Sequence, residues 1–180
     1  FLALIGAWFN SIRRRSLADP DARLAWFIIV GSIPAVVLGF LFDDFVESLF
    51  TEAQMVGLFL LITAIILAVA ELVAGRLQRP RTLEQMNWLD SILIGLAQAF
   101  ALLPGISLSG STIAMGLGRV IRRDLAARFS FLLGTPVIFG AGLLQLVDVL
   151  TSDASALTNQ WIPIVAGFIA AAIAGTVAIN

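Results

Sequence analysis

One short stretch of this sequence gathers the groups that bind anions. It reads Leu103-Pro104-Gly105-Ile106-Ser107-Leu108-Ser109-Gly110-Ser111-Thr112, with one proline, two glycines and four hydroxyls in an apolar context. Proline and glycine break helices. A helix that begins again near Ser109–Thr112 would aim its positive dipole end and its free N–H groups at an anion, which glycine lets the backbone approach closely. Phosphate is a natural ligand for such a turn.

The composition restricts the chemistry that can surround this turn. The chain has 180 residues, of which 59% are hydrophobic and only 13% are charged, whereas soluble domains carry about 25% charged residues. Its mean hydropathy is +0.99. Cysteine and histidine are both absent, which excludes disulfides, Cys/His metal sites and a catalytic thiol or imidazole. The sequence therefore indicates an integral membrane protein.

Long apolar runs must position the turn. They lie near 1–12, 24–42, 55–75, 89–103, 129–147 and 161–179, and several reach the roughly 20 residues that cross about 30 Å of hydrocarbon as a helix. Pro34 and Pro163, and the lack of strict alternation, disfavour a membrane barrel. We expect an all-α polytopic bundle forming a single membrane domain over residues 1–180. We interpret it as a fragment, because it opens without Met inside an apolar run.

The arginines predict the topology, because the chain has eleven basic residues and no lysine. They cluster after the first run, after the third run and after the turn, as Arg13, Arg14, Arg15 and Arg23, then Arg76, Arg79 and Arg81, then Arg119, Arg122, Arg123 and Arg128. If 89–103 enters the membrane and 104–118 returns, all of them share one side. Asp148 and Asp153 then join the acidic loop of Asp43, Asp44, Glu47 and Glu52 on the other side. We therefore predict a re-entrant helix pair at about 89–118.

The turn and its surroundings carry a family resemblance. The stretch Pro104–Thr112, followed by Phe129-Ser130-Phe131-Leu132-Leu133 and Pro136, resembles the undecaprenyl-diphosphate phosphatases, the bacitracin-resistance membrane phosphatases. Their signature reads P-G-x-S-R-S-x-x-T, with F-S-F-L-L and a proline downstream. The similarity extends upstream through Ile33–Gly39, Ala70-Glu71 and Gly95–Gln98. It implies two inverted repeats, each with a re-entrant helix pair, that meet near the bilayer midplane.

The resemblance also implies an activity and its partners. The expected reaction is hydrolysis of undecaprenyl diphosphate to undecaprenyl phosphate and phosphate, which recycles the lipid carrier of peptidoglycan synthesis. Mg²⁺ or Ca²⁺ is the implied cofactor, with its ligands expected outside this chain. The implied location is the bacterial inner (plasma) membrane, as a multi-pass protein. The expected partners are the polyprenyl diphosphate lipid and the bilayer; no nucleic acid is expected, and a homo-oligomer is left open.

Site residues carry over by their match to the signature. The predicted catalytic residues are the signature hydroxyls Ser107, Ser109 and Thr112. The predicted substrate-binding residues are Gln98, Pro104, Gly105, Gly110 and Ser111. No metal ligand is assigned. A simpler interpretation is that these hydroxyls bond their own backbone or bridge neighbouring helices, as is common in membrane proteins.

Two departures from the family pattern leave other functions open. Leu108 stands where the signature has arginine, and leucine cannot make bidentate, permanently charged contacts with phosphate. By analogy with removed oxyanion-hole donors, the loss costs on the order of 10² to 10³ in rate. The family's E-x-x-x-E motif is expected upstream of Phe1. The alternatives are a catalytically impaired relative, or a transporter, that binds or moves polyprenyl phosphate without hydrolysing it.

Overall fold

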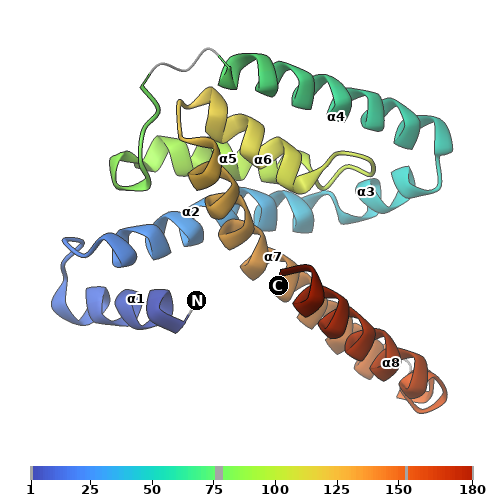
Figure 1. Cartoon of the computed structure of the whole chain (residues 1–180). Coiled ribbons are helices and arrows are strands. Elements are labelled where there is room, and N and C mark those ends of the chain that lie inside the picture. The colour runs from blue at the N-terminus through green and yellow to red at the C-terminus, as the bar shows by residue number, and fades with distance from the viewer. Residues whose placement is uncertain (1, 76–78, 153, 180) are drawn as a thin grey trace. The chain divides into compact units, whose positions relative to one another are not determined.

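The computed structural model describes residues 2–75, 79–152 and 154–179, and these residues are predominantly helical (Figure 1). The helices are α1 (Leu2–Arg14), α2 (Pro20–Leu41), α3 (Asp43–Phe50), α4 (Ala53–Ala74), α5 (Trp88–Phe100), α6 (Leu108–Gly118), α7 (Arg123–Ser152) and α8 (Ala154–Ile179), with a short 3₁₀ turn at Leu83–Gln85. The predicted all-α class is confirmed. Arg76 and Asp153, which entered the topology prediction, lie outside the described residues.

Four of these helices are long and apolar enough to cross a membrane. They span Pro20–Leu41, Ala53–Ala74, Arg123–Thr151 and Trp161–Ala178. The predicted polytopic membrane bundle is therefore confirmed, and the chain is a multi-pass membrane protein. The first predicted run forms α1, whose 13 residues extend only about 20 Å.

Local signals explain where two helices differ from the predicted runs. Helix α2 begins at Pro20, four residues before the run that starts at residue 24, because the Asp19 side chain accepts a hydrogen bond from the Asp21 N–H at 3.0 Å. Such a cap followed by proline at the first position favours helix initiation. The predicted acidic loop contains the short helix α3, with Asp43 and Asp44 in its first turn. Their negative charge complements the helix dipole.

The chain forms two compact units, residues 1–137 and 138–180. The core of the first unit contains the buried side chains of Phe27, Ile28, Met86, Ile94, Ile121, Phe129 and Leu133. The second unit holds the end of α7 and α8, where the described side chains are predominantly exposed and apolar. The single domain predicted over residues 1–180 stays a prediction.

Within the first unit, α2 and α5 touch backbone to backbone. A Cβ added to Gly95 would lie 2.0 Å from the carbonyl oxygen of Gly31, which no real side chain could tolerate. Beside this crossing, the Ser91 hydroxyl donates a hydrogen bond to the Phe27 carbonyl at 2.5 Å. Helix α5 is therefore fixed against a membrane-spanning helix along its length.

Helices α5 and α6 form a hairpin joined by the turn at residues 101–107 (Figure 1). Helix α6 packs against both α5 and α4. With 13 and 11 residues, the two helices extend roughly 20 and 16 Å and are too short to cross the hydrocarbon singly. The helix break lies where the sequence predicts it. Its insertion as a re-entrant pair, and the inverted repeat, stay predictions.

Candidate functional site

Gly105 gives the turn its shape. Its φ is +96°, a conformation that L side chains rarely adopt. A Cβ at this position would also lie 2.7 Å from the Val56 carbonyl oxygen and 3.2 Å from the Leu60 nitrogen on α4. The glycine is thus required both by its backbone angle and by the close approach of α4, while Pro104 is buried beside it.

Thr63 on α4 holds the same turn through one hydroxyl. Its Oγ1 donates a hydrogen bond to the Gly105 carbonyl at 2.8 Å and accepts one from the Ser107 N–H at 3.1 Å. Two polar backbone groups of the turn are therefore satisfied from a neighbouring helix, as buried non-helical backbone requires.

The first turn of α6 presents hydrogen-bond donors that are unpaired within residues 2–75, 79–152 and 154–179. Ser107 is the N-cap, and its Oγ accepts a hydrogen bond from the Gly110 N–H at 3.1 Å. This leaves the Ser107 hydroxyl hydrogen free to donate. Among the described residues, the N–H groups of Leu108 and Ser109 and the hydroxyl of Ser109 have no hydrogen-bond partner. Together with the helix dipole, these groups form an anion-binding N-terminus.

Thr112 points away from these donors toward α7. Its Oγ1 lies 2.8 Å from the Leu108 carbonyl oxygen and 2.5 Å from the Ser130 Oγ, and its side chain is buried. Since a carbonyl can only accept, we assign the Thr112 hydrogen to the Leu108 carbonyl and the donor role to Ser130. Thr112 therefore bonds its own helix backbone and bridges to a neighbouring helix.

Ser111 and Gln98 are both buried and incompletely bonded. Ser111 is 6% exposed, and its hydroxyl has no partner among the described residues; it lines a groove beside α4 and α5. Gln98 is fully buried. Its Nε2 donates to the Leu133 carbonyl at 3.4 Å, while its Oε1 bonds no group in the described part of the chain. No hydrogen bond within the described part of the chain joins Gln98 to the hydroxyls of the turn. Of the predicted residues, the structure gathers five at the turn and the first turn of α6, namely Pro104, Gly105, Ser107, Ser109 and Gly110.

Leu108 is the first residue of α6 and brings no charge to this place. The described residues contain no group of three or more His, Cys, Asp or Glu side chains that could hold a metal. Mg²⁺ in such sites is held by one or two carboxylates together with substrate phosphates, and the turn offers hydroxyls and amides. The residues of the turn therefore do not fit a resident metal ion.

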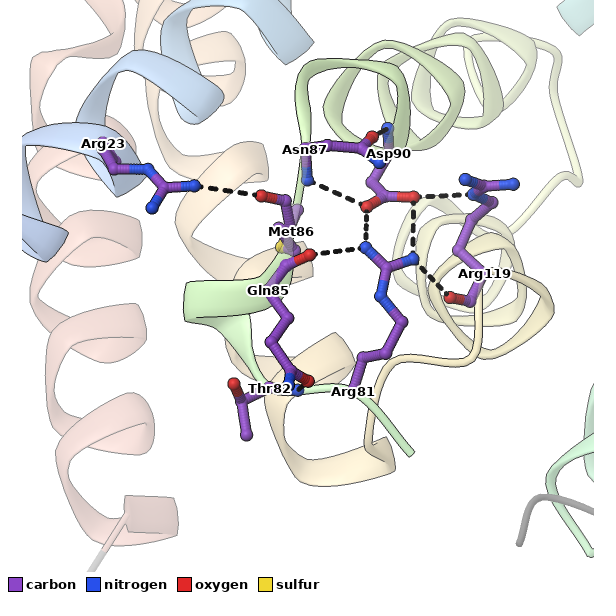
Figure 2. A network of polar contacts seen from close by, with 8 residues as sticks. All are labelled: Arg23, Arg81, Thr82, Gln85, Met86, Asn87, Asp90 and Arg119. Atoms are coloured by element: carbon purple, nitrogen blue, oxygen red, sulfur yellow. Dashed lines mark hydrogen bonds and ion pairs between the residues drawn. The ribbon is translucent and has the colours of Figure 1, made fainter. Parts of the chain in front are cut away.

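The open end of the hairpin is the end opposite the turn, where α5 begins at Trp88 and α6 ends at Gly118. A charge cluster at Asp90 holds this end together (Figure 2). The Asp90 carboxylate is fully buried and lies 2.5 Å from Arg81 Nη2 and 2.7 Å from Arg119 Nε. It also accepts the Asn87 N–H at 3.0 Å, in a capping box at the start of α5. Burial by itself raises the pKa of Asp90, but the hydrogen bonds from Arg81, Asn87 and Arg119 outweigh it and hold that pKa below its ordinary value.

The topology prediction uses Arg81 and Arg119 only for their positive charge. The structure shows that they join the loop after α4 and the end of α6 to the start of α5. The Arg81 N–H donates to the Val120 carbonyl at 2.7 Å, and Val120 has φ +63°, a strained angle for a β-branched residue. The only local sign of this cluster is the spacing of Asn87 and Asp90, which is typical of a helix cap.

Sequence comparisons find relatives along most of this chain. The family described as "Bacitracin resistance protein BacA" matches residues 1–180. The chain is 44% identical over 151 residues to a Pseudarthrobacter chlorophenolicus protein named undecaprenyl-diphosphatase, covering 83% of this chain and 53% of that protein. Proteins of the same name from Rubrobacter xylanophilus and Methanosphaera stadtmanae are 41% and 43% identical, over 99% and 89% of this chain and 64% and 55% of their own lengths. The chain thus spans between about half and two thirds of the length of these curated relatives.

Proposed function

This chain belongs to the Bacitracin resistance protein BacA family, and we propose on that premise that it acts on undecaprenyl diphosphate in the bacterial inner membrane. The proposed reaction is hydrolysis of the terminal phosphoanhydride, giving undecaprenyl phosphate and inorganic phosphate. The main support is the N-terminus of α6, where unpaired donors meet a helix dipole within the family's signature.

The donors of the turn suit a phosphoryl group. The free N–H groups of Leu108 and Ser109 would bind phosphate oxygens, while the hydroxyls of Ser107 and Ser109 donate to the same group. Preorganised donors of this kind stabilise the charge that develops during phosphoryl transfer. Thr63 and Gly105 hold the backbone in place, so binding costs little rearrangement. We propose Mg²⁺ or Ca²⁺ as the cofactor. The protein ligands of this ion would be residues other than those of the turn.

Leu108 supports a second candidate function. Where a signature arginine would add a fixed positive charge, this chain has an uncharged side chain. A turn built from amides and hydroxyls alone would still bind a polyprenyl phosphate. It would stabilise the transition state of hydrolysis less than a turn with an arginine. The second candidate is therefore a protein that binds or moves polyprenyl phosphate and hydrolyses it slowly or not at all.

Phosphate release from undecaprenyl diphosphate with Mg²⁺ separates these functions. We would use the chain extended by the N-terminal repeat that the family resemblance implies. It would be compared with its Leu108→Arg variant, and with Leu108→Met as a control that keeps the volume and adds no charge. The Arg variant is expected to release phosphate faster by on the order of 10² to 10³, as expected for one charged transition-state contact, and the Met variant at an unchanged rate. Equal rates for all three would refute the role given to position 108. Tight substrate binding without release by any of them would favour the second candidate.

A further inference from the structure

A groove runs along the hairpin on the side of α4. It has a volume of about 590 Å³ and lies between α4, α5 and α6, within the range of small-molecule sites. Its walls are apolar except for Ser111, and the main side chains are Ile66, Val69, Val73, Leu96, Phe100 and Met115.

The surface around the groove is apolar enough to face the hydrocarbon region of a bilayer. Helix α4 is one of the membrane-crossing helices, with a mean hydropathy of 2.7. Val69 in the groove and Leu72 beside it are 52% and 64% exposed. A water molecule needs two to four polar partners to be held in a cavity, which these walls do not offer. The chemistry of the lining therefore selects a hydrocarbon chain.

The groove ends next to a positively charged residue. Its lining reaches Gly118, the last residue of α6, and Arg119 follows as the C-cap of that helix. Arg119 continues the four-residue spacing of the lining residues Ser111 and Met115. Arg119 bonds Asp90 through Nε alone, and its two terminal nitrogens have no partner among the described residues (Figure 2).

Arg81 in the same cluster has no such spare capacity. Its Nη1 and Nη2 donate to Asp90 and to the carbonyls of Arg119 and Gln85. The side chain of Arg119 is 31% exposed. Two arginines and one aspartate leave this cluster with a net positive charge, which Arg119 can present to an anion.

We propose that the groove and Arg119 together bind one anionic phospholipid of the bilayer, with an acyl chain in the groove and the headgroup phosphate on the guanidinium. This position differs from that of the proposed substrate. The eleven residues of α6 place Arg119 roughly 16 Å from the donors at the helix N-terminus. A lipid whose phosphate lies on Arg119 is therefore not the one whose phosphate lies at the turn. Anionic lipids are attracted by about 1 kcal/mol per basic residue near the surface, or about fivefold in affinity.

Native mass spectrometry of the intact chain in detergent tests this proposal. The delipidated protein would be titrated with phosphatidylglycerol and, separately, with phosphatidylcholine of the same acyl chains. We expect one phosphatidylglycerol to bind about fivefold more tightly than phosphatidylcholine. Equal affinities for the two lipids would overturn the proposal.

Variants in α4 and at Arg119 test where the lipid binds. Val69→Trp fills the groove and should abolish the tight binding, whereas Leu72→Trp, on α4 outside the groove, should leave it unchanged. Arg119→Gln should lose the about fivefold preference and Arg119→Lys should keep it. Val69 lies on α4 and takes no part in the hydrogen bonds or ion pairs shown for Asp90 in Figure 2. Val69→Trp therefore tests the groove even where Arg119→Gln fails to fold.

A competing lipid provides the last control. Undecaprenyl phosphate should bind without displacing phosphatidylglycerol. Displacement of one lipid by the other would contradict the proposal and indicate that the polyprenyl chain occupies the groove. Unchanged phosphatidylglycerol binding by Val69→Trp would also contradict it, because the groove would then hold no lipid. None of these measurements depends on phosphate release.

Discussion

The two ends of the α5–α6 hairpin are held by different kinds of interaction. At the open end, a buried carboxylate joins two arginines and a helix cap. At the turn, one threonine hydroxyl and a glycine with φ +96° hold the chain by neutral contacts. The charged end uses most of its polar groups on itself, although the terminal nitrogens of Arg119 stay unpaired among the described residues. The neutral end leaves amides and hydroxyls unpaired. The interactions that stabilise the hairpin are therefore strongest at the charged end, and the donors proposed for the substrate lie at the turn.

The largest effect should come from removing the charge that holds the open end. Asp90→Asn leaves two arginines facing a neutral group, and loss of one partner from a buried ion pair should cost about 3 kcal/mol in the free energy of unfolding. Equilibrium unfolding in mixed detergent micelles would measure this loss in the free energy of unfolding. The exposed pair of Asp124 with Arg122 gives a matched control, because Asp124→Asn should cost under about 1 kcal/mol.

The same residue makes the stability depend on pH. Because the pKa of Asp90 is lowered in the folded state, its contribution is present above the pKa of the unfolded chain and is lost as the pH falls through the folded pKa. The Asp90→Asn protein should lack this acid-dependent loss. An identical pH profile for both proteins would assign the acid sensitivity to other carboxylates.

A methyl group at the turn should have the next largest effect. Gly105→Ala combines an unfavourable φ with a contact of 2.7 Å to the Val56 carbonyl, and we expect a loss of about 2 kcal/mol in stability. Substrate binding should fall as well, since the turn must shift. Gly57→Ala on α4 has nothing within 4 Å of the added Cβ and should stabilise the protein by up to about 1 kcal/mol. Equal effects of the two substitutions would show that the turn is not tightly fixed.

Removal of the hydroxyl that links α4 to the turn should have a smaller effect on stability. Thr63→Val keeps the shape but leaves the Gly105 carbonyl and the Ser107 N–H unpaired, at a cost of about 1 kcal/mol. Thr63→Ser should restore both stability and the Michaelis constant for undecaprenyl diphosphate, because it retains the hydroxyl. If Thr63→Val binds substrate as well as the parent chain does, Thr63 does not position the turn.

The smallest change in stability should occur where the turn keeps its free donors. The Ser109 hydroxyl bonds no described residue, so Ser109→Ala should alter unfolding by under about 0.5 kcal/mol. Its affinity for undecaprenyl diphosphate should fall by about tenfold, as expected when one hydrogen bond to a charged group is lost. Ser107→Ala should differ, because it also removes the cap of α6 and costs about 1 kcal/mol in stability. A normal affinity in Ser109→Ala would remove this hydroxyl from the site.

The neutral end was easier to predict from the sequence than the charged end. The break at Pro104-Gly105 follows from local backbone rules, and the family signature lies on the same residues. The Asp90 cluster joins residues up to 38 positions apart, as the bond from Arg81 to the Arg119 carbonyl shows, and no local pattern carries such pairings. The orientation of Thr112 toward α7 also needed the packing of the helices. The left-handed Val120 had no sequence signal, because β-branched residues disfavour that conformation.

The bond between Thr63 and the turn gives α4 a mechanical role. Helix α4 is long and apolar enough to cross the bilayer, and a crossing helix changes its tilt when the hydrocarbon thickness changes. Since a single hydroxyl on α4 holds both the Gly105 carbonyl and the Ser107 N–H, a change in that tilt pulls on the backbone that shapes the anion-binding end of α6. We therefore expect the geometry of the anion-binding site to depend on the thickness of the surrounding membrane, because α4 connects the lipid to the turn.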